Sequence, residues 1–181
     1  MIFALWFVAV FSFLPPANSQ NVEVAKEYKV KVAYVYNFAR YIKWPRGTYA
    51  GADATFVIGV HGEAPFGDNL KRLAESRQIQ GHRIVIQHYE TPQDYKPCQI
   101  LFITESVDDE SRDKIVKLTK AEPVLIVGES SGFATHGAGI NFYHDVDDTI
   151  GFEINVDNLR QRHLSVDARL LKLARIVGDE Q

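Results

Sequence analysis

The stretch CQILFITESVDDESRDKIVKLTKAEPVLIVG, residues 98–128, decides the fold. Two apolar runs within it, 100–103 and 124–127, have the length and continuity of strands that are buried on both faces. Between them, residues 109–119 carry apolar side chains at helical spacing. A strand, a helix and a second strand in this order predict two parallel strands that are joined by a helix.

The same alternation extends toward the amino terminus. FVIGV at 56–60 reads as a short buried strand, 68–76 as a helix, and 83–89 as a strand with alternating apolar residues. A longer helical pattern covers 24–42 and ends before Pro45. We therefore predict an α/β fold: a single three-layer domain with a central, mostly parallel sheet and helices on both faces.

The last third of the chain has a different pattern. Residues 140–143 and 150–154 are separated by an acidic turn, which predicts a hairpin at the sheet edge. A short helix at 156–162 follows, and Ser165 is placed to cap a final helix. Four apolar residues share one face of that predicted helix: Val166, Leu170, Leu173 and Val177.

Composition and charge narrow the functional classes. The chain has 181 residues, of which 46% are hydrophobic and 24% charged, within the range of ordinary globular proteins. Its net charge of -3 supplies no electrostatic attraction to DNA or to anionic lipid. We therefore expect no nucleic-acid partner.

The amino terminus has the layout of an export signal. Residues 2–14, IFALWFVAVFSFL, contain no charge and precede PPANSQ. This run is shorter than the roughly 20 apolar residues that span a bilayer. Small residues at Ala17 and Ser19 favour cleavage before Gln20. We predict a signal peptide at 1–19 and one domain at 20–181 that does not insert into the membrane; the alternative is an uncleaved anchor.

A single cysteine, Cys98, follows Pro97 and precedes the apolar run at 100–103. One thiol forms no intrachain disulfide, so the exported domain must be stable through packing alone. A structural role fits this setting better than a reactive one.

The helix predicted at 24–42 carries more apolar surface than one stripe requires. Its core face holds residues at spacings of 4, 3, 4 and 3: Tyr28, Val32, Val35, Ala39 and Ile42. Tyr34, Phe38 and Tyr41 form an aromatic flank beside that face. Either a loop or strand of the same domain or a second chain must cover this flank.

Residues 128–132, GESSG, fit the GxSxG pattern of a nucleophile elbow and follow a buried strand. An Asp of the turn at 145–148 and His163 would complete the order serine, acid, histidine. An elbow also requires a long helix after the serine, and Gly137 and Gly139 interrupt the segment that follows. A glycine-rich turn is therefore favoured over a serine hydrolase that uses Ser130.

Metal and phosphate motifs are weak. The histidines show no HxH or HExxH spacing, and one cysteine excludes a thiolate cluster. Asp145, Asp147 and Thr149 resemble the start of a calcium loop, but Ile150 and Val156 replace its required glycine and glutamate. No glycine cluster leads into GK[ST]. We expect no metal and no cofactor.

Several segments together resemble the YfiR-like family of periplasmic regulators, in order and over nearly the whole exported chain. They are VKVAYVYNFARYIKWP (30–45), FVIGVHGEAPFG (56–67), CQILFIT (98–104), GFATHGAGINF (132–142), FEIN (152–155) and LLKLARIV (170–177).

The resemblance implies a periplasmic α/β domain that forms a homodimer and has no enzymatic activity. Members of this family repress an inner-membrane diguanylate cyclase by binding its periplasmic sensor part, and so lower cyclic di-GMP and biofilm formation. Others are expected to serve sensor kinases. This chain departs from the disulfide-stabilised members because it has Cys98 alone.

A binding role directs attention to side chains that could contact a partner or a second copy. The candidates are Tyr34, Phe38, Tyr41, Trp44, Glu153, Asn155 and Arg175. A periplasmic small-ligand binder that reports to a receptor or kinase is the alternative function.

Overall fold

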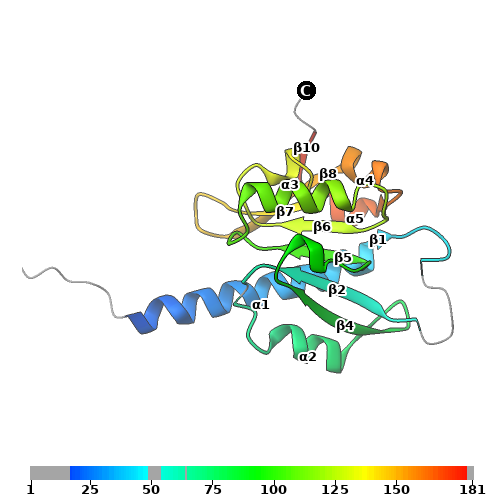
Figure 1. The fold of residues 1–181 in the computed structure, drawn as a ribbon. Helices are drawn as coiled ribbons and strands as arrows, with labels where there is room; N and C mark the ends of the chain where they lie inside the picture. Colours follow the sequence, from blue (N-terminus) through cyan, green and yellow to red (C-terminus); the bar gives the residue numbers. More distant parts are fainter. Residues whose placement is uncertain (1–16, 49–53, 64, 179–181) are drawn as a thin grey trace, which may run out of the picture.

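A computed structural model describes residues 17–48, 54–63 and 65–178 of the chain. Its main feature is one curved sheet of eight strands (Figure 1). The strands lie in the order β10 (Arg175–Val177), β8 (Ile150–Asn155), β7 (Ile140–His144), β6 (Leu125–Gly128), β5 (Ile100–Ile103), β2 (Phe56–His61), β4 (His82–Tyr89) and β3 (Gln78–Ile79). The neighbouring pairs from β4 to β7 are parallel, which confirms the predicted α/β fold.

Helices lie on both faces of this sheet (Figure 1). The α-helices are α1 (Ala17–Tyr41), α2 (Asn69–Ser76), α3 (Asp109–Leu118), α4 (Val156–Gln161) and α5 (Ala168–Leu171), and single 3-10 turns are η1 (Pro92–Asp94) and η2 (Phe133–Thr135). Helices α1 and α2 pack in one hydrophobic cluster and α3 in a second, on opposite faces of the same strands. Alternate residues of β5 show this division, because Phe102 belongs to the first cluster and Leu101 to the second.

The predicted hairpin is present but does not form the edge of the sheet. Strands β7 and β8 are antiparallel, with Phe142 opposite Phe152. Strand β10 then pairs in parallel with the outer side of β8 and becomes the edge strand. The predicted edge position of the hairpin is therefore wrong. The pairing of β10 with β8 joins distant residues, and the local pattern of the hairpin does not encode it.

The predicted final helix is wrong over most of its length. Ser165 and Val166 form the short strand β9, which pairs antiparallel with β1 (Ile42–Lys43). Helix α5 spans only Ala168–Leu171, and its capping side chain is Asp167, which accepts a hydrogen bond from a backbone N–H. Apolar spacing at four positions suggested a helix, but the two flanking segments form strand pairs with distant residues instead.

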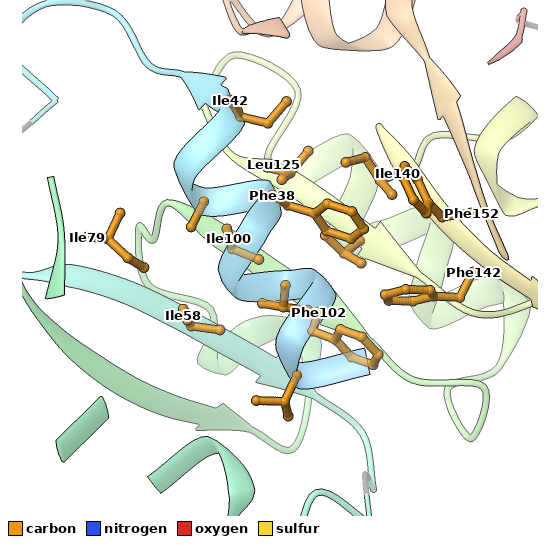
Figure 2. Packing of buried hydrophobic residues seen from close by; sticks show 14 of the residues in the cluster. Phe38, Ile42, Ile58, Ile79, Ile100, Phe102, Leu125, Ile140, Phe142 and Phe152 are labelled. Carbon is orange, nitrogen blue, oxygen red and sulfur yellow. The ribbon is translucent and has the colours of Figure 1, made fainter. Parts of the chain in front are cut away.

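Part of the aromatic flank of α1 is covered within the protomer, and Phe38 is its most enclosed member (Figure 2). Phe38 is 0% exposed, and its ring centroid lies 5.1 Å from that of Phe152 and 5.6 Å from that of Phe142. Tyr34 packs against the same two rings. The sequence left open whether the same domain or a second chain covers this flank. For Tyr34 and Phe38 the cover is the strand pair β7–β8 of the same domain.

The predicted signal peptide lies largely outside the described residues, which begin with α1 at Ala17. No helix within the described part of the chain is both long and apolar enough to cross a bilayer. Cleavage before Gln20 stays a prediction.

Candidate partner-binding site

Two of the candidate residues, Glu153 and Arg175, come from separate strands and form one ion pair. They are register partners on β8 and β10, and Arg175 Nη1 lies 3.1 Å from Glu153 Oε1. Parallel pairing of β10 with β8 thus joins two residues that are 22 positions apart. The sequence identified both but gave no reason to place them together.

An aromatic ring lies beside this ion pair. The Arg175 guanidinium carbon is 3.8 Å from the centre of the Tyr143 ring, a cation–π geometry. A Cβ on Gly151 would lie 2.4 Å from that ring, so the glycine leaves the space that Tyr143 occupies. Strands β7, β8 and β10 therefore each contribute one side chain to a row across the sheet.

This row remains accessible at the sheet edge. The Arg175 side chain is 52% exposed and that of Glu153 14% exposed. Leu173 and Ile176, at 72% and 52%, are large apolar side chains exposed next to it in sequence. Because Ile176 follows Arg175 in the strand, its side chain points to the other face of β10. We call Tyr143, Glu153, Leu173 and Arg175 the C-terminal patch. It offers a cation, a carboxylate and apolar surface to another molecule, a mixture typical of the rim and core of protein interfaces.

Asn155 does not belong to this patch, because its side chain is buried. Its Oδ1 accepts a hydrogen bond from the backbone N–H of Asn158, which caps α4, and its Nδ2 donates to the carbonyl of Ala134. Asn155 is 0% exposed. Asn155 is therefore corrected from an interface candidate to a structural residue at the junction of β8 and α4.

Tyr41 and Trp44 are half-buried and lie where α1 ends. The Tyr41 ring lies between the guanidinium groups of Arg40, at 5.8 Å, and Arg169, at 5.0 Å. Trp44 Nε1 donates a 3.3 Å hydrogen bond to the carbonyl of Gln99. Tyr41 keeps surface beside the two arginines, whereas Phe38 is wholly enclosed and is corrected from an interface candidate to a core residue.

A buried charge cluster was missed by the sequence analysis. The side chains of Lys31 and Glu129 are 5% and 4% exposed, and Lys31 Nζ lies 2.7 Å from Glu129 Oε2. Tyr28 Oη donates a 2.7 Å hydrogen bond to Glu129 Oε1. Lys31 lies three residues after Tyr28 and four before Val35, on the core face of the helix. A charged residue at that position was the signal that could have revealed the cluster.

Glu27 extends the cluster toward the surface. It pairs with Lys31 one turn away, and His144 Nε2 lies 3.3 Å from its Oε1. Partial burial opposes ionisation of Glu27, but the hydrogen bond and the charge of Lys31 outweigh it and lower the pKa of this carboxyl group. Burial and the adjacent Glu129 raise the pKa of Tyr28. The cluster therefore ties α1 to the residue that follows β6, through an ion pair and a hydrogen bond.

The GxSxG segment does not have the geometry of a nucleophile elbow. Ser130 Oγ accepts a 3.0 Å hydrogen bond from Arg112, which is permanently charged and cannot act as a base. The chain continues into the three-residue turn η2 through Gly132 at φ 72°, rather than into a long helix. Among the described residues, the side chains that form hydrogen bonds with Ser130 are those of Arg112 and Asn141 and not that of His163. The glycine-rich turn is the interpretation that this geometry supports.

The remaining reactive groups have structural surroundings. Burial raises the pKa of the Cys98 thiol to about 12, so it stays protonated at neutral pH. In the acidic turn, Asp147 Oδ1 accepts hydrogen bonds from the amide and hydroxyl of Thr149. Within the described residues, no group of three or more His, Cys, Asp or Glu side chains could hold a metal ion.

The chain is a single α/β domain, with accessible polar and apolar side chains at one edge of its sheet. A family model described as YfiR/HmsC-like matches residues 28–175. The chain belongs to the YfiR/HmsC-like family. A comparison with curated proteins gives no match.

Proposed function

We propose that the protein is a periplasmic repressor that binds the periplasmic sensor part of an inner-membrane diguanylate cyclase. The family match over residues 28–175 carries this proposal. The matched region includes both the buried cluster around Lys31 and all four members of the C-terminal patch. Repression of the cyclase would lower cyclic di-GMP and biofilm formation.

The C-terminal patch is the surface we assign to the sensor. A repressor needs to bind the inactive conformer of its partner more tightly than the active one. Moving a balance from 1:99 to 99:1 takes about 5.5 kcal/mol of differential affinity. An exposed arginine that is already stacked on Tyr143 can supply part of this, because Arg and Tyr are enriched among residues that dominate binding.

The central experiment measures binding and signalling together. Purified residues 20–181 are mixed with the periplasmic domain of an inner-membrane diguanylate cyclase from the same cell, and the complex is followed by size exclusion. In cells, cyclic di-GMP is measured with and without the protein. We expect a complex and a lower nucleotide level; a complex with no change in cyclic di-GMP would refute the repressor role.

The Glu153–Arg175 pair allows folding and recognition to be separated. Glu153→Lys breaks the ion pair, whereas the double variant Glu153→Lys/Arg175→Glu restores it with the charges exchanged. We expect both variants to fold and to bind the sensor at least tenfold more weakly, because the partner meets reversed charges. Asp157→Lys, at the exposed pair with Arg160, is the matched control and should bind normally. Unchanged binding in the double variant would remove the pair from the site.

Export and assembly complete the proposal. We infer that residues 1–19 are removed on export and that the domain acts as a homodimer. Mass spectrometry of periplasmic material should find Gln20 at the amino terminus, and sedimentation equilibrium should give twice the protomer mass. An intact terminus in a membrane fraction would favour the uncleaved anchor instead.

A further inference from the structure

The edge of the sheet opposite β10 is open along most of β4. The terminal strand β3 pairs only with His82 and Arg83, at the start of β4. From Ile84 to Tyr89, β4 has no strand on its outer side among the described residues. Native sheets normally cover or shorten such an edge, because its free N–H and C=O groups pair readily with another chain.

The direction of the backbone groups follows from the ladder. The carbonyl of Tyr89 accepts a hydrogen bond from Gly62, directly after β2, and so faces inward. Successive residues of a strand alternate in the direction of their backbone groups. The N–H and C=O groups of Ile84, Ile86 and His88 therefore face outward. Those of Ile86 and His88 lie beyond β3 at the free edge, whereas the register of β3 places Arg77 opposite Ile84. None of the six edge residues is a proline or a lysine, the usual protections of an exposed edge.

A groove runs beside this edge, between β4 and α2. One hollow of about 290 Å³ includes Phe66, Leu70 and Ile86 in its lining. A second, of about 690 Å³, continues past Ile84 toward the start of β4. Ala74 and Glu75 line both hollows, which therefore adjoin along the strand, and we call the two together the channel. Side chains of an added strand would enter this channel at every second residue.

The charge around the channel is positive. Lys71, Arg77 and Arg83 line it, against one carboxylate, that of Glu75. These three cations have no ion-pair partner within the described part of the chain, whereas the neighbouring Arg72 is paired with Asp68. An occupant with acidic side chains would complement this rim.

We propose that the β4–α2 groove binds an extended polypeptide segment of alternating apolar and acidic residues, which adds to β4 as a further strand. The backbone of the segment pairs with Ile86 and His88, and its apolar side chains enter the channel beside Ala74. Its acidic side chains alternate with these and lie nearest Arg83, whose side chain is on the opposite face of β4 from Ile84 and Ile86. This surface is on the opposite edge from the C-terminal patch, so the inference does not depend on the proposed repressor role.

The test uses a defined peptide on the complete domain, residues 20–181. The probe is a blocked eight-residue peptide of alternating valine and glutamate, titrated into labelled protein and followed by NMR. We expect shifts confined to β4 and α2, and at least tenfold slower amide exchange at Ile86 and His88. A peptide of alternating valine and lysine, with the same strand propensity, should bind at least tenfold more weakly. A weak peptide complex has a Kd of about 1 mM. Absence of binding by the valine–glutamate peptide at that concentration would overturn the proposal.

Variants separate backbone pairing from groove filling. His88→Pro removes an outward N–H and should weaken binding at least tenfold, whereas His88→Thr keeps the N–H and should bind normally. Ala74→Phe fills the channel from the helix side and should also block the peptide, without any change to β4. Peptide binding unaffected by both His88→Pro and Ala74→Phe would refute the proposal. The proposal would also be refuted if the protein alone formed a dimer that the His88→Pro substitution dissociates. The occupant of the β4 edge would then be a second copy of this chain.

Discussion

The ion pairs Lys31–Glu129 and Arg175–Glu153 differ in burial and therefore in role. Lys31 and Glu129 are separated by 2.7 Å with side chains 5% and 4% exposed. Arg175 and Glu153 are separated by 3.1 Å, and the arginine is 52% exposed. A buried charge is costly unless it is paired, whereas an exposed pair contributes little to folding. The first pair therefore fixes α1 on the sheet, and the second leaves its charges available for recognition.

The largest effect is expected from breaking the buried pair. Lys31→Met keeps the hydrocarbon stem but leaves Glu129 without its cation, and should lower the free energy of unfolding by about 3–5 kcal/mol. Urea denaturation at neutral pH measures this loss. The double variant Lys31→Met/Glu129→Gln removes both charges and should recover much of it. A loss below about 1 kcal/mol in the single variant would show that the pair contributes less than its burial indicates.

A smaller effect is expected from pH at the outer end of the same cluster. The pKa of Glu27 is lower in the folded protein than its ordinary value of 4.5. Its ionised form therefore stabilises the fold above about pH 4.5, and this contribution disappears as the pH falls through the lower folded pKa. Glu27→Gln should lose less stability than the parent between about pH 5 and pH 3. Urea midpoints at several pH values measure the difference, and parallel curves for the two proteins would contradict it.

The exposed pair should matter little for folding. Arg175→Ala removes a screened ion pair and a stack on Tyr143, together about 1 kcal/mol or less of unfolding free energy. Binding of the cyclase sensor domain should nevertheless fall at least tenfold. Arg160→Ala, which removes another exposed pair with Asp157, serves as the control and should leave binding intact. A loss of several kcal/mol in the free energy of unfolding of Arg175→Ala would contradict the difference in role between this pair and the Lys31–Glu129 pair.

The smallest effect on stability is expected at Leu173. This side chain is 72% exposed, so Leu173→Ser should change the free energy of unfolding by about 0.5 kcal/mol at most. Isothermal titration with the sensor domain should show weaker binding, because apolar surface of the C-terminal patch is lost. Normal affinity in this variant would confine the patch to its charged members.

Local patterns in the sequence were sufficient for the parallel part of the sheet. The runs that became β5 and β6 and the helix between them are continuous and strongly apolar or periodic, so nearby residues decide them. Residues 165–177 were misread because β9 and β10 form through pairing with Ile42 and with β8. A helical spacing that rests on only four apolar residues is overridden by strand pairing with distant residues.

Burial divides the residues that the sequence offered as interface candidates into two groups. Glu153, Arg175 and Tyr41 keep accessible surface, whereas Phe38 and Asn155 are enclosed. Helical periodicity placed Phe38 on a flank, and only the position of β7 and β8 determined what covers that flank. The link between Glu153 and Arg175 likewise depends on the register of two strands.

The sequence by itself determined the α/β class, the core face of α1 and the likeness to a regulatory family, because periodicity and composition are properties of neighbouring residues. The tertiary structure alone decided which charges are buried and which are exposed, and which sheet edges remain open. The physical reason is that burial and strand register depend on residues far apart in the chain, whose approach no local pattern specifies.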